Sequence, residues 1–168
     1  MIGSLLLGII SDSHDNLPKI DLAVAKLNSL EVELVLHAGD YCAPFAALRF
    51  RELKPKLMGV FGNNDAERDL LRKKFESLGH EVRGRFLSLE FDEMRIGLLH
   101  GDEENLVEEL TRSQNYDLII SGHTHSVDKL QTGRTVCLNP GEVCGYLSGR
   151  ATIATFETST RTIEILDI

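Results

Sequence analysis

Residues 5–14 read LLLGIISDSH, an apolar run of strand length that leads directly into Asp12 and His14. A short apolar run of this kind predicts a buried β-strand over residues 5–10. The polar side chains would then lie just past the carboxyl end of the strand. Open α/β sheets place their binding sites at that edge, and the same arrangement recurs along the chain.

Four further apolar runs are followed by residues that can bind metal ions. They are residues 34–36 before His37-Ala38-Gly39-Asp40, residues 57–61 before Gly62-Asn63-Asn64-Asp65, residues 96–99 before His100-Gly101-Asp102, and residues 118–120 before Ser121-Gly122-His123-Thr124-His125. If every run is a strand, one site collects oxygen and imidazole ligands for two divalent metals. Such a site suggests hydrolysis of a phosphate ester.

The composition limits the kinds of partner. The chain has 168 residues, 42% hydrophobic and 26% charged, which predicts one globular domain over residues 1–168. The formal net charge of −8 argues against a nucleic-acid groove or an anionic membrane surface, because both need a basic face. A small phosphate substrate stays open, since bound metals reverse the local sign of the charge.

The cysteines and residues 1–10 give indications of where in the cell the protein is found. Cys42, Cys137 and Cys144 are odd in number and lack C-x-x-C spacing, so we expect free, buried or half-buried thiols and a cytoplasmic protein. Residues 1–10 are apolar but lack a positive leading region and a cleavage-type ending, so we interpret them as the first strand. No apolar run approaches the length that crosses a membrane.

The first half of the chain alternates strands with helices. The expected helices are one capped by Asn16 with Pro18 in its first turn and reaching Leu30, one from Pro44 to Leu53, and one capped by Asp65 and ending at Gly79. Alternation of this kind implies parallel strands joined by right-handed crossovers.

The second half is rich in strands. We expect a hairpin of residues 86–91 and 94–99 around an Asp92-Glu93 turn, a helix over 103–115, a strand over 118–120, a hairpin of 127–131 and 135–138, a loop over 141–150, and a hairpin of 151–156 and 162–165. The predicted fold class is therefore α/β, with two mixed β-sheets packed face to face and flanked by helices.

Each motif also has an ordinary structural interpretation when it is taken alone. Asp12 can cap a helix, Gly39-Asp40 and Gly62-Asn63 are common in turns, and a single histidine such as His100 is often structural. Two histidines spaced like His123 and His125 after a strand more often bind metal. Asp40 can bridge two ions with one oxygen for each, and Gly122 lets the backbone approach the ions closely.

Two histidines lie outside the ligand motifs. His37 precedes Asp40 closely, and both a contact to the ligands and plain core packing are open for it. His80 is expected in a solvated turn between a helix and a strand.

In chain order the motifs are D-x-H, G-D, G-N-x-D, H-G and G-H-x-H, and this set resembles the calcineurin-like metallophosphoesterase superfamily. It is most similar to the small bacterial and archaeal single-domain phosphodiesterases, from about residue 5 to residue 150, including Asn139-Pro140-Gly141 and Arg150. The resemblance implies an α/β/β/α sandwich. It also implies one metal ion held by Asp12, His14, Asp40 and His125, and a second held by Asp40, Asn63, His100 and His123. Asp40 and a hydroxide, the nucleophile, would bridge the two ions.

The resemblance makes Asn64, Asp40 and His100 the candidate catalytic residues. Many members of the superfamily have histidine at the position of Asn64. Asparagine donates a hydrogen bond but cannot act as an acid near neutral pH, and general acid catalysis contributes roughly 10²–10⁴-fold. We therefore expect poor activity on esters with basic leaving groups. Manganese is the expected metal, with nickel, zinc, iron and cobalt as alternatives.

The preferred prediction is a metal-dependent phosphodiesterase that hydrolyses small phosphate diesters in a dinuclear site. A phosphomonoesterase or nucleotidase of the same superfamily is the first alternative. The second is a non-catalytic scaffold, as in a subunit of the eukaryotic retromer coat that resembles these enzymes. Filled ligand positions favour the enzyme. A homodimer through an edge strand or a helix face stays open, and Glu142, Cys144 and Tyr146 have no predicted role.

Overall fold

The computed structural model describes residues 4–91, 93–103 and 105–168. Its elements in chain order are β1 (Leu6–Ile10), α1 (Leu17–Ser29), β2 (Leu34–His37), the 3-10 helix η1 (Pro44–Glu52), β3 (Lys56–Gly59), α2 (Arg68–Ser77), β4 (Glu81–Val82), β5 (Phe86–Phe91), β6 (Met94–Leu99), α3 (Leu106–Ser113), β7 (Leu118–Ile120), β8 (Val127–Thr132), β9 (Thr135–Pro140), β10 (Thr152–Glu157) and β11 (Thr162–Asp167).

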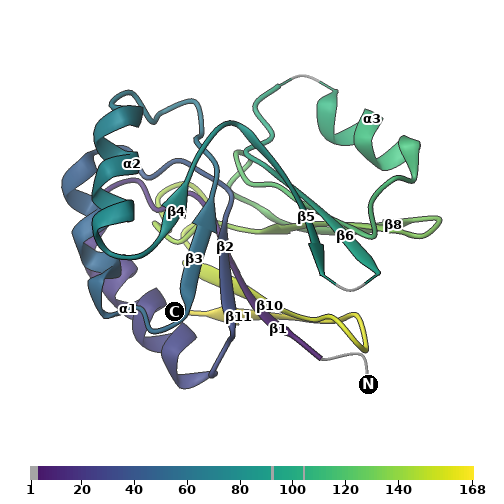
Figure 1. The fold of residues 1–168 in the computed structure, drawn as a ribbon, viewed down its shortest axis with the longest axis horizontal. Helices are drawn as coiled ribbons and strands as arrows, with labels where there is room; N and C mark the ends of the chain where they lie inside the picture. The colour runs from purple at the N-terminus through teal and green to yellow at the C-terminus, as the bar shows by residue number, and fades with distance from the viewer. Residues whose placement is uncertain (1–3, 92, 104) are drawn as a thin grey trace.

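The strands form two mixed sheets (Figure 1). The first has the order β11-β10-β1-β2-β3-β4, in which β1 to β4 are parallel and β10 runs antiparallel to β1. The second has the order β5-β6-β7-β9-β8, with β6, β7 and β9 parallel and a hairpin strand at each edge. The prediction of two mixed sheets with flanking helices is confirmed.

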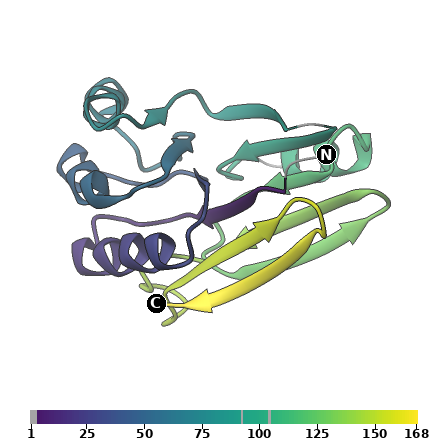
Figure 2. The same cartoon turned by 60° about the horizontal axis from the view of Figure 1, so that its bottom comes forward.

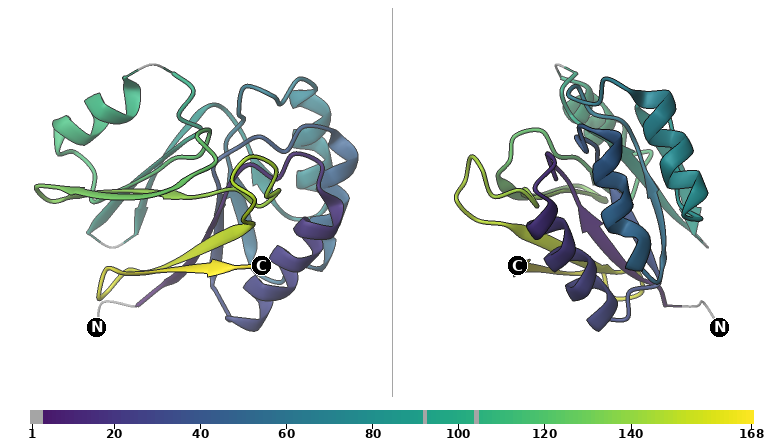
Figure 3. Two further views of the ribbon diagram at one scale, coloured as in Figure 1. Left: turned by 180° about the vertical axis from the view of Figure 1, so that it is seen from behind. Right: turned by 90° about the vertical axis from the view of Figure 1, so that its left-hand side faces the viewer.

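Three apolar clusters hold these layers together. Alternate residues of β1 point to opposite faces: Leu7 and Ile9 join the cluster between the two sheets, and Ile10 joins the cluster beneath the helices. The cluster that contains Ile10 lies under α1, η1 and α2, which run side by side on the outer face of the first sheet (Figures 2 and 3). A third, smaller cluster around Tyr116 and Ile119 lies under α3 on the outer face of the second sheet.

The helix starts follow the sequence in part. Asn16 caps α1 by accepting a hydrogen bond from the Lys19 amide, with a proline in the first turn, as predicted. The prediction that Asp65 caps α2 is wrong, because Glu67 occupies that position and Asp65 binds other backbone amides. The segment after Pro44 forms a 3-10 helix rather than an α-helix and ends before Pro55.

The remaining differences concern element length. Helix α3 spans fewer residues than the predicted 103–115, and strand β4 was not predicted because two residues give no periodicity. Residues 1–3 of the predicted first strand and Asp92 of the predicted turn lie outside the described residues. Cys42, Cys137 and Cys144 are free thiols. Within the described ranges, every helix is too short or too polar to cross a bilayer.

Candidate metal centre

Backbone hydrogen bonds join the loops that follow the strands. The Asp12 amide donates to the carbonyl of Gly39 over 3.0 Å, which ties the loop after β1 to the loop after β2. In the second sheet, the Gly122 amide donates to the carbonyl of His100 over 2.8 Å. The His123 amide donates to Oδ2 of Asp12 over 3.0 Å, so the two sheets are joined at the candidate site itself.

Asp12, His14 and His125 form the first group of side chains. Asp12 is fully buried, and its Oδ1 lies 3.5 Å from Nε2 of His14 and 3.4 Å from Nε2 of His125. Among the described residues, Asp12 Oδ1 and His14 Nε2 have no hydrogen-bond partner although both are shielded from solvent. Buried polar atoms without partners are rare and require an explanation. These atoms converge on one small volume, so a cation there would satisfy them.

Asp40, His100 and Asn63 form the second group. Oδ2 of Asp40 lies 3.3 Å from Nε2 of His100, and that nitrogen lies 3.0 Å from Oδ1 of Asn63. The same Oδ2 lies 3.4 Å from Nε2 of His14, so one oxygen faces both groups. The other oxygen, Oδ1, accepts a hydrogen bond from the Asn64 amide over 2.9 Å. Oδ2 is therefore the oxygen of Asp40 that faces the imidazoles of both groups.

Asn64 and His123 lie at the exposed side of the site. The side-chain amide of Asn64 donates to Oδ2 of Asp40 over 2.7 Å. His123 is exposed, and its ring lies 5.2 Å from the ring of His100 in an edge-on arrangement. All seven predicted ligands therefore border one region, with Asp12, Asp40 and His100 buried and the side chains of Asn63 and His123 facing solvent.

The backbone is strained where these side chains are presented. The candidate ligands with positive φ, a conformation uncommon for residues other than glycine, are Asp12 (53°), His14 (38°), Asp40 (61°), His123 (68°) and His125 (59°). Strained residues of this kind persist where the surroundings hold them, and they cluster at functional sites. The folded chain thus holds the ligands in place through its loops.

Two glycines allow the loops to approach each other. A Cβ atom at Gly122 would lie 1.8 Å from Oγ of Ser11 and 2.6 Å from Oδ2 of Asp12. A Cβ atom at Gly62 would lie 2.0 Å from Oδ1 of Asp40. Gly122 therefore makes room for the carboxylate of Asp12, which is a more specific role than the predicted approach to the ions.

Glu142 supports His125 from behind and was not assigned a role from the sequence. It is fully buried, and its Oε2 lies 2.5 Å from Nδ1 of His125 and accepts a hydrogen bond from Sγ of Cys144 over 2.9 Å. Its Oε1 accepts from the amides of Leu147 and Ser148. These donors outweigh the effect of burial and lower the pKa of Glu142 to about 2. The ionised carboxylate directs Nε2 of His125 toward Asp12.

Asp65 organises the loop that carries Asp40. Its Oδ1 accepts from the amides of Tyr41 and Cys42, both over 2.8 Å, and its Oδ2 accepts from those of Asp40 and Gly62. Burial raises the pKa of this carboxyl despite these donors. The sequence predicted a helix cap for Asp65, and the structure shows instead that it binds the loop backbone.

The other two histidines are structural. His37 is fully buried, accepts the Gly39 amide at Nδ1 and stacks against Tyr41, so the core-packing interpretation holds. Burial lowers the pKa of His37 to about 3. The prediction that His80 is solvated is wrong: it is buried, accepts the Leu57 amide at Nδ1, and lies 3.1 Å from the Phe50 carbonyl at Nε2.

The charges of the site match a divalent cation. Burial alone would lower the pKa of His14, but Asp12, Cys42 and Asp40 together outweigh burial and raise the pKa to about 10. Burial disfavours the charged form of Asp40, yet His100 and Asn64 hold its pKa well below the usual range. Buried carboxylates and imidazoles within 4.8 Å of one another are a suitable donor set for first-row divalent metals.

Comparisons with known proteins point to one family and fold. The profile described as "Calcineurin-like phosphoesterase superfamily domain" matches residues 5–161. A phosphodiesterase of Methanocaldococcus jannaschii is 36% identical over 153 residues, which cover 90% of this chain and 92% of that protein. A solved archaeal phosphodiesterase superposes with a TM-score of 0.92 at 33% identity, covering 98% of this chain and 100% of the other. A phosphoesterase from E. coli shares the fold, with a TM-score of 0.71 at 20% identity over 98% of this chain and 100% of that chain.

Proposed function

Because the chain belongs to the calcineurin-like phosphoesterase superfamily and is a phosphoester hydrolase, we propose that it hydrolyses phosphate diesters in a dinuclear metal site. The observation that carries the proposal is the unpartnered Oδ1 of Asp12, which faces Nε2 of both His14 and His125 at the buried end of the site. A divalent cation at that point explains why these atoms lack other partners.

We assign the ligands to two ions that share one carboxylate. Asp12, His14, Asp40 and His125 would hold one ion, and Asp40, Asn63, His100 and His123 the other. Support for Asp40 as the shared ligand comes from its Oδ2, which faces the imidazoles of both groups at 3.3–3.4 Å. Manganese is the metal that we favour, although this donor set also suits nickel, zinc, iron and cobalt.

When bound, such ions lower the pKa of a water molecule toward 7, and they offset the negative charge that develops on the phosphate oxygens. The chain itself positions the donors. The Nδ1 atom of His100 donates to the Ala38 carbonyl over 2.8 Å, which orients the ring so that Nε2 is directed at Asp40. Glu142 fixes His125 in the same way.

The exposed side of the site would receive the phosphate. Asn64 lies there with a side-chain amide that donates to Asp40 and can turn toward a phosphate oxygen. An amide cannot protonate a leaving group near neutral pH, so the leaving group must depart without help from this position. A diester with an acidic leaving group, such as p-nitrophenol, is the substrate type that tolerates this best.

The test compares bis-p-nitrophenyl phosphate with p-nitrophenyl phosphate, using metal-stripped protein to which Mn²⁺ is returned. We expect metal-dependent hydrolysis of the diester, weaker hydrolysis of the monoester, and loss of both in His123→Ala. Hydrolysis that favours the monoester would replace the proposal with a phosphomonoesterase. Absence of turnover with any first-row divalent metal, in protein shown to be folded, would reject catalysis by this site.

A further inference from the structure

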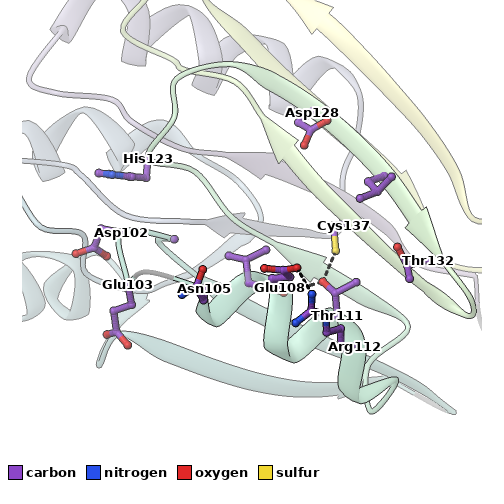
Figure 4. A pocket seen from close by; sticks show the side chains of 13 residues that line it. Asp102, Glu103, Asn105, Glu108, Thr111, Arg112, His123, Asp128, Thr132 and Cys137 are labelled. Carbon is purple, nitrogen blue, oxygen red and sulfur yellow. Dashed lines mark hydrogen bonds and ion pairs between the residues drawn. The ribbon is translucent and has the colours of Figure 1, made fainter.

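A cavity of about 640 Å³ opens beside His123, between α3 and β8 (Figure 4). It exists because α3 packs on β7 and β9 through Val107 and Leu110 and leaves the outer face of β8 uncovered. Gly101 and His123 are among its lining residues, so the cavity borders the candidate metal centre at His123. Binding pockets for small molecules have volumes of about 300–1,000 Å³, so the space suits an organic group.

The walls of the cavity are partly apolar. Alternate residues of β8, Asp128, Leu130 and Thr132, face it, while Lys129 and Gln131 do not line it. Leu130 is 56% exposed, so its side chain is available for contact with a ligand. Val107 and Thr111 of α3 and Cys137 of β9 also line the cavity, and Cys137 pairs with Leu130 in the register of β8 and β9. The hydroxyl of Thr111 contacts Sγ of Cys137 (Figure 4).

The charges around the cavity are predominantly negative. Glu108 pairs with Arg112, and Asp102 and Glu103 both pair with Arg85. Asp128 lines the cavity and, within the described ranges, has neither an ion pair nor a side-chain hydrogen bond. A further phosphate or carboxylate placed here would meet these carboxylates, whereas a cationic or neutral group would not be repelled.

We propose that this cavity holds an organic substituent of the phosphate ester, and that this substituent is uncharged or cationic with apolar surface. The inference rests on the proposed function, since it places the phosphate at the metal centre and the substituent beside His123. It assigns the substrate class: diesters of neutral or amino alcohols, and not diesters that carry a second phosphate or a carboxylate on that alcohol. Asp128 and Leu130 are then the residues that determine specificity.

The test uses monoesters with a single substituent as competitive inhibitors of bis-p-nitrophenyl phosphate hydrolysis. The probes are ethyl phosphate, phosphocholine, phenyl phosphate and 3-carboxypropyl phosphate. We expect phosphocholine and phenyl phosphate to inhibit more strongly than ethyl phosphate, and 3-carboxypropyl phosphate to inhibit least. Because all four present the same phosphate to the metal centre, differences among their inhibition constants report the substituent.

Variants on β8 assign the effect to the cavity. Asp128→Asn should raise the inhibition constant of phosphocholine by about fivefold and lower that of 3-carboxypropyl phosphate. Leu130→Ser should raise that of phenyl phosphate by about fivefold. Lys129→Gln is the matched control, because it changes a charge on the same strand outside the cavity.

Each outcome separates the two proposals. If the diester is hydrolysed but the four inhibitors bind alike, or the Asp128 and Leu130 variants match Lys129→Gln, the cavity assignment is wrong and the phosphodiesterase proposal stands. If the folded, metal-loaded protein hydrolyses no diester, both proposals are overturned. Stronger inhibition by the carboxylated probe than by phosphocholine would reverse the assigned substrate class.

Discussion

The carboxylate of Glu142 lies 2.5 Å from Nδ1 of His125 and fixes which nitrogen of that imidazole faces the metal centre. A carboxylate only accepts hydrogen bonds, so Nδ1 is the donor to Glu142, and the opposite ring nitrogen, Nε2, lies 3.4 Å from Oδ1 of Asp12. Contacts of this type orient metal-binding histidines and raise their basicity.

Replacing Glu142 with glutamine should weaken metal binding by about 10- to 100-fold, because an amide neither orients nor polarises His125 as a carboxylate does. Calorimetric titration of metal-stripped protein with Mn²⁺ measures the change. Glu164→Gln, at an exposed position on β11, is the matched control. Unchanged affinity in a folded Glu142→Gln protein would show that His125 needs no such support.

Replacing Asp65 with asparagine should destabilise the fold by roughly 3 kcal/mol, since buried backbone amides lose acceptors when an amide NH₂ takes the place of one oxygen. The amides at risk are those of Asp40, Tyr41, Cys42 and Gly62. Urea unfolding of the metal-free protein measures this directly. Asp69→Asn changes a carboxylate that is 83% exposed and should cost less than about 0.5 kcal/mol.

The stability of the metal-free protein should fall as the pH drops from about 6.5 to about 4.5. Burial lowers the pKa of His37 from 6.5 to about 3, and it lowers the pKa of His80 as well. In this pH range His37 and His80 are protonated in the unfolded chain but stay neutral in the folded protein, so a falling pH favours unfolding. The pKa of Glu142 falls from 4.5 in the unfolded chain to about 2 in the folded protein, so this carboxylate adds to the loss of stability mainly below that pH range.

Urea unfolding at several pH values gives this slope, and His37→Phe should flatten it without abolishing it, because His80 remains. The phenylalanine also keeps an aromatic ring against Tyr41. A slope that is identical in His37→Phe and in the parent protein would mean that His37 does not resist protonation.

Hydrolysis should slow steeply as the pKa of the leaving group rises, since Asn64 cannot donate a proton. Asn64→His should flatten this dependence, with a gain of up to about 10²-fold on the most basic leaving group. A series of substituted phenyl diesters measures it. Asn64→Ala is the control, because it loses the hydrogen bond to Asp40 without gaining an acid. Equal slopes for the histidine and alanine variants would contradict this role.

The sequence predicted the layers and the gathering of the candidate ligands because both depend on local patterns. Apolar runs mark the buried strands, and the strand ends of the first sheet that carry Asp12 and Asp40 meet the strand end of the second sheet that carries His100. The carboxyl ends of parallel strands meet whatever the loops between them do. Helix starts with a local signal, such as Asn16, were also predictable.

The errors concern contacts between residues far apart in the sequence. Asp65 looks like a helix cap, but its partners are amides near Asp40, more than 20 residues earlier. His80 looks solvated until the backbone of Leu57 is placed beside it. Glu142 has no recognisable spacing to His125, because the turn that joins them depends on the hairpin between them. Side-chain hydrogen bonds over such distances leave no periodic trace in a sequence.

The left-handed backbone at His123 and His125 affects which substitutions directed evolution of this chain would select. Glycine adopts that conformation without strain, whereas histidine is strained in it. Selection for heat resistance alone would therefore favour glycine at these two candidate ligand positions. Variants selected in that way should gain thermal stability and lose catalytic activity. Alternating rounds of heating and catalytic screening should keep both histidines.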